Sequence, residues 1–279
     1  MASTEVTREH LLGSQHLTGC LALSQAAHWN QNTADWQLML EIGRGYGLTL
    51  GDGTLAATTI TLPYSERFAW VSMVLVLPEH RRKGYATQLL KRALAELKIE
   101  NRAAILDATP DGREVYSLEG FRDTWGFKRF VVEDCRNFEF DVAEVRALRP
   151  PDWPQIATLD QAAFGADRVR LLQALALRFP QAACVCEREG KIAGFVLGRD
   201  GREANQVGPL VASDAATARV LLGSVLARVR PPVYVDLVDR EAPLPGFSFQ
   251  RLFTRMVHGA ERAPGNESLV YCPAGPELG

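Results

Sequence analysis

The sequence lacks long apolar runs. None of its 279 residues fall in a stretch of about 18 uninterrupted apolar residues, the length that a membrane-spanning helix needs. The start MASTEVTREHLL has no basic stretch followed by an apolar run, so it does not look like an export signal. We therefore expect neither membrane insertion nor export, and we expect a cytoplasmic protein.

The chain also lacks a marked excess of either charge. Its formal net charge is −2, which gives no overall attraction to nucleic acid or to anionic lipid, so we expect neither as a partner. Hydrophobic residues make up 47% and charged residues 23%, a balance typical of a globular protein with a real core. One short basic patch stands out, at Arg81, Arg82 and Lys83.

Metal-binding and several catalytic signatures are missing. The five cysteines are odd in number and lack paired ligand spacing, and the five histidines are scattered, so we expect reduced thiols and no metal. There is no GxSxG element, no phosphate loop ending in Gly-Lys-Ser/Thr and no full dinucleotide fingerprint. The cysteines are Cys20, Cys135, Cys184, Cys186 and Cys272, and the histidines are His10, His16, His28, His80 and His258.

The first half reads as a mixed α/β domain. Apolar spacing predicts helices at 17–28, 35–42 and 87–97 and a short one at 113–119. Alternating or β-branched runs predict strands at 46–50, 54–62, 68–77, 103–107, 127–132 and 137–140.

The second half repeats this order of elements. A helix begins near Asp152, a hairpin follows at 182–187 and 191–199, and then come a strand (207–212), a helix (215–228) and strands at 233–238 and 251–258. We expect two domains, residues 1–141 and 142–279.

The loop Arg81-Arg82-Lys83-Gly84-Tyr85-Ala86 lies between an apolar strand and a helix. A helix N-terminus presents unpaired amide donors and a partial positive charge, which together favour an anion. Gly84 leaves room for close approach, and the cationic side chains can reach phosphate oxygens. These features suit a pyrophosphate.

The segment VLVLPEHRRKGYATQLL resembles the acyl-CoA-binding motif of the GNAT acetyltransferase superfamily, and Arg81, Gly84 and Ala86 match its fixed positions. The resemblance implies an α/β (α+β) fold in which two tandem domains each carry a mixed, mostly antiparallel sheet flanked by helices, with acetyl-CoA as acyl donor. It implies that the loop amides bind the pyrophosphate, and that the strand backbone pairs with pantetheine. The residues concerned are Arg81, Arg82, Lys83, Gly84, Tyr85, Ala86 and Thr87 for the loop, and Val74, Leu75 and Val76 for the strand.

GNAT enzymes, as the resemblance implies, let a deprotonated amine attack the thioester directly. Tyr116 resembles the tyrosine that many of them use to protonate the departing thiolate, although it could instead simply pack within the short helix. For the base, Glu41, Glu66 and Asp107 are candidates, and no spacing singles out one of them. A chain of waters would serve equally.

The stretch His28, Trp29, Asn30 and Gln31 lies where GNAT proteins place the connection between their first two helices, which commonly forms one wall of the acceptor site. Within it, Trp29 and Asn30 are the candidate contacts with the acceptor. A flat apolar ring beside an amide suits a small ligand. The alternative is that Trp29 and Trp36 hold the first two helices together.

The second half, which resembles the C-terminal domain of a bacterial tandem-GNAT group, lacks the cofactor loop. The corresponding residues 210–217 contain neither glycine nor arginine, and Ser213 or Asp214 is a predicted helix N-cap. We therefore expect one acyl-CoA site per chain. Asp167 and Arg168 could contact the acceptor or form a structural pair, and we favour the second interpretation.

The sequence thus predicts an acyl-CoA-dependent N-acetyltransferase acting on a primary amine of a small molecule. Two alternatives stay open: a CoA-thioester-binding regulatory or scaffolding protein without turnover, and an enzyme that modifies a protein lysine or N-terminus. Acyl chain length, acceptor identity and oligomeric state cannot be read from the residues.

Overall fold

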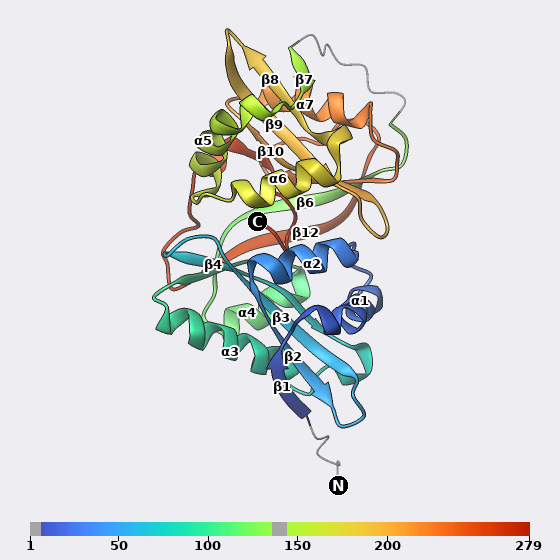
Figure 1. The fold of residues 1–279 in the computed structure, drawn as a ribbon, viewed down its shortest axis with the longest axis vertical. Coiled ribbons are helices and arrows are strands. Elements are labelled where there is room, and N and C mark those ends of the chain that lie inside the picture. The colour runs from blue at the N-terminus through green and yellow to red at the C-terminus, as the bar shows by residue number, and fades with distance from the viewer. Residues whose placement is uncertain (1–6, 136–143) are drawn as a thin grey trace. The chain divides into compact units, whose positions relative to one another are not determined.

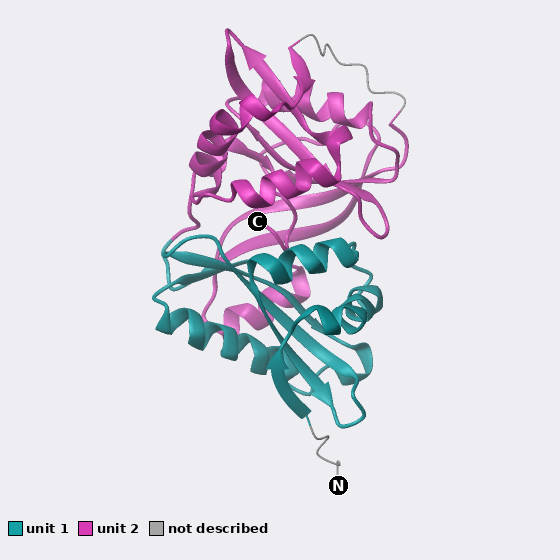
Figure 2. Cartoon of the chain, in the orientation of Figure 1, with its two compact units in different colours: residues 1–106, 257–261 teal, residues 107–256, 262–279 magenta. Residues whose placement is uncertain are grey.

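A computed structural model describes residues 7–135 and 144–279. The chain divides into two compact units, residues 1–106 with 257–261 and residues 107–256 with 262–279 (Figure 2). The boundary predicted between residues 141 and 142 and the strand predicted at 137–140 lie outside the described residues.

The sheet of the first unit runs in the order β1-β2-β3-β4-β5 (Figure 1). Neighbours are antiparallel from β1 to β4, whereas β4 and β5 are parallel. The strands are β1 (Thr7–Leu11), β2 (Arg44–Leu50), β3 (Leu55–Pro63), β4 (Phe68–Val76) and β5 (Ala103–Ala108). The helices are α1 (Leu17–Ala26), α2 (Thr33–Ile42) and α3 (Tyr85–Ile99), with short 3₁₀ turns η1 (Ser14–His16) and η2 (Pro78–His80).

The core of the first unit lies on both faces of its sheet. Every residue of β3 from Leu55 to Leu62 is buried, and successive strand residues point to opposite faces, so both faces must be covered. On one face α3 packs Leu89 and Ala93 against Leu48 of β2. Helices α1 and α2 also pack against β3. This layering fixes the position of both ends of α3.

The sheet of the second unit runs in the order β12-β6-β11-β10-β9-β8-β7, with β13 added to β10. Strands β10 and β11 are parallel, whereas the pairs β6–β11, β9–β10, β8–β9, β7–β8 and β10–β13 are antiparallel. The strands are β6 (Arg122–Val132), β7 (Val145–Ala147), β8 (Cys184–Arg188), β9 (Lys191–Arg199), β10 (Asn205–Ala212), β11 (Val233–Val238), β12 (Phe247–His258) and β13 (Val270–Cys272). The helices are α4 (Pro110–Leu118), α5 (Trp153–Phe164), α6 (Val169–Arg178) and α7 (Ala215–Leu226), with 3₁₀ turns η3 (Pro150–Asp152), η4 (Pro180–Ala182) and η5 (Glu267–Leu269).

The order β9-β10-α7-β11 repeats the order β3-β4-α3-β5 of the first unit. In both, an antiparallel pair is followed by a helix and by a strand parallel to the second of the pair. The mixed, mostly antiparallel α/β fold is therefore confirmed. One strand pairing differs from a simple repeat, because β6 belongs to the first half of the sequence but pairs with β11 of the second half. The register runs from Val132 opposite Val233 to Phe127 opposite Val238.

Candidate functional site

An open strand edge lies on β4. The parallel pairing of β4 with β5 covers only Phe68 to Trp70, opposite Ala103 to Ile105. Beyond Trp70 no described strand pairs with this edge, so the backbone of Val74, Leu75 and Val76 can offer hydrogen bonds on the side away from β3.

A bulge sets the direction of this edge. The register between β3 and β4 shifts between Thr58 and Ile60, and Met73 takes a left-handed backbone with φ of 51°. The Thr58 hydroxyl donates to the carbonyl oxygen of Met73 at 2.8 Å, which fixes the bulge.

The loop after β4 turns sharply into α3. Gly84 is the N-cap of α3 with φ of 85°, and Arg82 also has a left-handed backbone with φ of 62°. A Cβ at Gly84 would meet no protein atom within 4 Å, so a side chain there would not clash with the protein. Glycine is favoured because of the left-handed backbone alone. The space beside Gly84 is open to a ligand.

The N-terminal end of α3 supplies anion-binding groups. Its first bond runs from Gln88 N to Gly84 O at 2.9 Å, so the helix does not use the amides of Ala86 and Thr87. Arg81 and Arg82 are exposed on the same loop. Free amides, the positive end of a helix dipole, open space and nearby guanidinium groups together fit the pyrophosphate of CoA.

Tyr116 lies on α4, in the second unit. Thr109 caps this helix by accepting from Gly112 N at 3.3 Å, and the Tyr116 ring packs against Phe121 with centroids 5.8 Å apart. Burial raises the pKa of the Tyr116 phenol above its ordinary value, so the phenol keeps its proton at neutral pH. Its role as the acid stays a prediction.

The connection between α1 and α2 is closely packed. The indole of Trp36 is fully buried and donates to the Ser24 hydroxyl at 2.9 Å, so Trp36 does hold the two helices together. Trp29 is partly buried and Asn30 is buried, and their predicted contact with an acceptor stays a prediction.

Gln31, the last residue of the predicted acceptor wall, follows Asn30 and is buried as well. Its side chain is only 3% exposed, and its carbonyl oxygen Oε1 accepts no hydrogen bond from any residue that the structure describes. A buried acceptor without a donor costs free energy, so a ligand N–H at this position would be stabilising. Burial of a glutamine in a connecting segment cannot be read from the local sequence.

The three candidate bases differ in their surroundings. Asp107 is fully buried and accepts two bonds from Arg255, at 2.8 and 2.9 Å, so both of its oxygens are engaged. Burial raises the pKa of Asp107, although Arg255 opposes the shift. Glu66 is exposed in the turn between β3 and β4, and Glu41 is exposed near the end of α2. The geometry singles out none of them as a base.

The second unit contains the counterpart of this site in a closed form. Parallel pairing of β10 with β11 stops at Val207, as that of β4 stops at Trp70. Here β13 pairs with the edge that remains, placing Cys272 opposite Leu210. The chain's own strand therefore occupies the position that corresponds to the open edge of β4.

The helix end beside this closed edge is also filled. Asp214 is the N-cap of α7, as predicted for Ser213 or Asp214, and its Oδ1 accepts from Thr217 N at 2.8 Å. A carboxylate in this position would also repel a phosphate.

The pair Asp167 and Arg168 has a structural role, although the partner differs from the prediction. Arg168 is buried and donates to Asp160, from Nε to Oδ2 at 2.9 Å and from Nη2 to Oδ1 at 3.0 Å. Asp167 instead accepts from Val169 N at 2.9 Å. The sequence does not reveal the Asp160 pairing because Asp160 lies on a separate helix, α5.

The described residues contain neither a cluster of metal ligands nor a membrane-spanning helix. Across residues 7–135 and 144–279, no cluster of three or more His, Cys, Asp or Glu side chains could hold a metal ion. No helix in the same ranges is both long enough and apolar enough to cross a bilayer.

Comparisons with known proteins agree with this geometry. Residues 17–121 match the acetyltransferase (GNAT) family, and residues 156–272 match an acetyltransferase (GNAT) domain. The chain is 26% identical over 239 residues to an uncharacterized N-acetyltransferase of Bacillus subtilis (strain 168), YitH, covering 84% of this chain and 83% of that one.

Two solved structures share the fold along nearly the whole chain. A putative acetyltransferase from Pyrococcus horikoshii superposes with a TM-score of 0.79 at 19% identity, covering 100% of this chain and 98% of that one. A tandem GNAT protein from the clavulanic acid biosynthesis pathway superposes with a TM-score of 0.62 at 15% identity, covering 94% and 100%. With one match in each half and a tandem fold throughout, the chain belongs to the GNAT acetyltransferase superfamily and carries two GNAT domains in tandem.

Proposed function

We propose that this chain transfers an acetyl or other short acyl group from acyl-CoA to a primary amine of a small molecule. The observation that carries the proposal is the first-unit site, where an open strand edge on β4 leads into a left-handed glycine at the start of α3. The two-domain division at residues 141 and 142 and the cytoplasmic location remain predictions beside it.

In this proposal the first unit binds the donor. Amides of the loop from Arg81 to Thr87 bind the pyrophosphate, and Arg81, Arg82 and Lys83 add positive charge. The pantetheine arm pairs with the backbone of Val74, Leu75 and Val76, because such an arm carries amides that can replace a strand neighbour.

The chemistry is direct acyl transfer. The amine nitrogen forms a bond to the acyl carbon, the carbon–sulfur bond breaks, and the sulfur leaves as a thiolate that takes one proton. Tyr116 is the proposed proton donor, since its phenol carries a proton that it can donate to the sulfur as charge develops. The amine proton passes to water or to a carboxylate.

A small-molecule acceptor is favoured by the buried acceptor atom beside the predicted acceptor residues. Gln31 Oε1 has no donor among the described residues and adjoins Asn30, so an N–H group of a compact substrate would satisfy it. A protein lysine is the second candidate acceptor, and a panel of amines and peptides distinguishes the two.

The test is calorimetric titration of acetyl-CoA into the wild-type chain, Gly84→Glu and Gly190→Glu. Gly190 is a matched control, since it also has a left-handed backbone, with φ of 75° against 85°, and a Cβ at either glycine meets no atom within 4 Å. Both variants therefore carry a similar backbone penalty, about 1–2 kcal/mol. Only Gly84→Glu places a carboxylate at the proposed pyrophosphate site.

We expect about one acetyl-CoA bound per chain in the wild type and in Gly190→Glu, and none in Gly84→Glu. Binding that survives in Gly84→Glu would contradict the assignment. Binding without turnover across the amine and peptide panel would favour the alternative of a CoA-thioester-binding protein without catalysis.

A further inference from the structure

A second pocket lies in the first unit, away from the acyl-CoA loop. It has a volume of about 180 Å³ and lies where α2 and α3 end and β2 begins. The acyl-CoA loop is at the opposite end of the 15-residue helix α3, so about 20 Å of helix separates the two. Its lining residues include Glu41, Gly43, Arg44, Glu96, Glu100 and Arg102.

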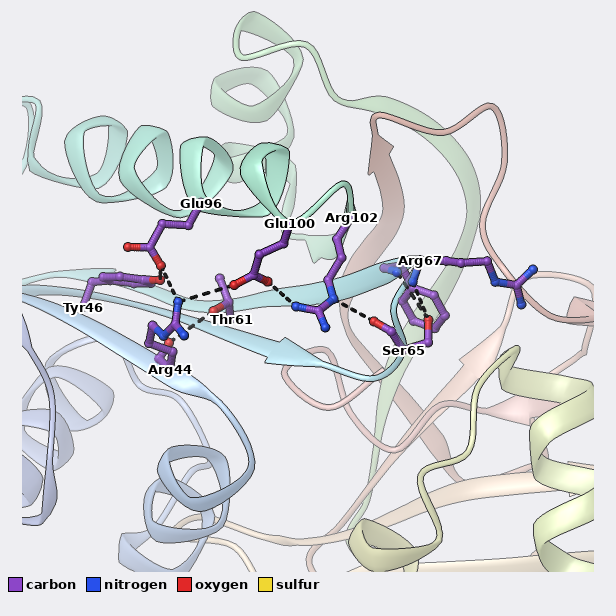
Figure 3. A network of polar contacts seen from close by, with 9 residues as sticks. Arg44, Tyr46, Thr61, Ser65, Arg67, Glu96, Glu100 and Arg102 are labelled. Atoms are coloured by element: carbon purple, nitrogen blue, oxygen red, sulfur yellow. Dashed lines mark hydrogen bonds and ion pairs between the residues drawn. The ribbon is translucent and has the colours of Figure 1, made fainter.

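The cations on the pocket wall are already paired. Figure 3 shows Arg44 pointing toward Glu96 and Glu100, with Arg102 on the far side of Glu100. Arg44 Nη1 lies 2.7 Å from Glu96 Oε2 and 3.6 Å from Glu100 Oε1, and Arg102 pairs with Glu100 and donates from Nε to Ser65 O at 2.8 Å. Each guanidinium is thus already paired with a carboxylate, so the wall carries little unbalanced positive charge.

Tyr46 closes this network from the strand side. Its hydroxyl donates to Glu96, and burial together with the Glu96 carboxylate raises the pKa of Tyr46 to about 12. Arg92 also binds Glu96, with Nη2 2.6 Å from Oε1. Hydrogen bonds and opposite charges hold the pKa of Glu96 below its ordinary value despite partial burial, so this carboxylate is both charged and fully engaged.

The unused groups of the pocket are acceptors. Glu41 is exposed and makes no ion pair or hydrogen bond with any residue in 7–135 or 144–279. Within the same ranges, no amide donates to the carbonyl oxygens of Glu41 and Ile42, which line the pocket and end α2. These carbonyls carry the partial negative charge of a helix C-terminus. At the end of α3, Glu100 N and Arg102 N already bind the carbonyls of Glu96 and Leu97 at 3.0 and 2.8 Å, so these two carbonyls are engaged.

We propose that this pocket binds a small organic cation with a primary ammonium group, at a site separate from the acyl-CoA site. The ammonium pairs with the Glu41 carboxylate and donates to the terminal carbonyls of α2, which together match three N–H donors. The inference does not depend on the proposed function, because no residue of the acyl-CoA loop takes part.

Calorimetric titration of putrescine at constant ionic strength tests the site. The wild type, Glu41→Gln, Glu79→Gln and Gly84→Glu are compared. Glu79 is a matched control, since it is an exposed carboxylate at the other end of α3. Thermal unfolding of each variant checks that it folds, and both glutamates are exposed, so we expect no change in fold.

We expect saturable binding to the wild type, Glu79→Gln and Gly84→Glu, and at least tenfold weaker binding to Glu41→Gln, about 1.4 kcal/mol. Tetramethylammonium, which has the charge without N–H donors, should bind at least tenfold more weakly than putrescine. The proposal would be overturned by no putrescine binding at about 10 mM, by equal binding to Glu41→Gln, by equal weakening in Glu79→Gln, or by equal binding of tetramethylammonium. Loss of putrescine binding in Gly84→Glu would also overturn the proposal, because it would place putrescine in the acyl-CoA site. If Gly84→Glu still binds putrescine and the wild type does not bind acetyl-CoA, only the proposed function is contradicted.

Discussion

Replacing Asp160 by asparagine tests the buried pair that holds α5 to the segment before α6. The side chains of Arg168 and Asp160 are only 3% and 1% exposed, and the pair is bidentate. Removing one partner of such a pair leaves the other as a buried charge without its counter-ion, which costs about 3–5 kcal/mol. Arg168 retains contacts with the carbonyls of Leu278 and Gly279, so we expect the lower end, about 3 kcal/mol, for Asp160→Asn.

The assay is urea unfolding followed by far-UV circular dichroism, with wild type, Asp160→Asn and the double variant Asp160→Leu/Arg168→Met in parallel. A loss of about 3 kcal/mol lowers the midpoint by roughly 1–2 M urea at a typical slope. The double variant should regain most of the loss, because apolar residues of similar size often replace a buried ion pair at little cost. A loss below about 1 kcal/mol for Asp160→Asn would refute the argument from buried charge.

Three further predictions follow from single side chains. Asp214→Ala should destabilise the fold by about 1 kcal/mol at pH 7 in urea unfolding, because it removes the cap of α7. Hydrogen bonding by Thr217 holds the pKa of Asp214 below its ordinary value. The stability difference between wild type and Asp214→Ala should therefore shrink as the pH falls below about 4 and the carboxylate takes a proton. A stability difference independent of pH would contradict the capping role. Tyr116→Phe should lower kcat by about 100-fold or more in a thiol-release assay while leaving acetyl-CoA affinity unchanged, and an unchanged kcat would exclude Tyr116 as the acid. Burial raises the pKa of Cys20 to about 12, so this thiol should react with an aromatic disulfide reagent at pH 8 only after unfolding, as measured by peptide mapping, and rapid labelling of the native chain would show that α1 opens.

The parts of the site that could be predicted from sequence are local. A strand, a glycine loop and a helix are consecutive in the chain, so the local sequence from Val74 to Thr87 is enough to predict their arrangement. In the structure, Gly84 has a left-handed backbone and is the N-cap of α3. The cap at Asp214 is local for the same reason. Helix α6 was missed although Leu171, Leu172 and Leu175 have helical spacing and are all buried.

The features that escaped prediction depend on long-range pairing. Strand β13 has only three residues, and its role comes from lying beside β10. Strand β6 was predicted as a strand, but its partner β11 is about a hundred residues away in sequence, as Lys128 opposite Leu237 shows. The orphan acceptor on Gln31 depends on burial by several elements at once. Local pattern carries no information about these partners.

The strand β13 keeps the edge of β10 paired without any free ligand. A covalently attached strand cannot dissociate into bulk solvent, so the edge of β10 stays paired whatever the supply of CoA thioesters in the cell. An open edge on β4 is filled only by mass action, and a ligand at 100 times its Kd adds about 2.7 kcal/mol to the stability of the unit that binds it. With the proposed acyl-CoA binding at β4, the first unit would gain stability as the supply of CoA thioesters rises, whereas the pairing of β13 with β10 stabilises the second unit at any supply.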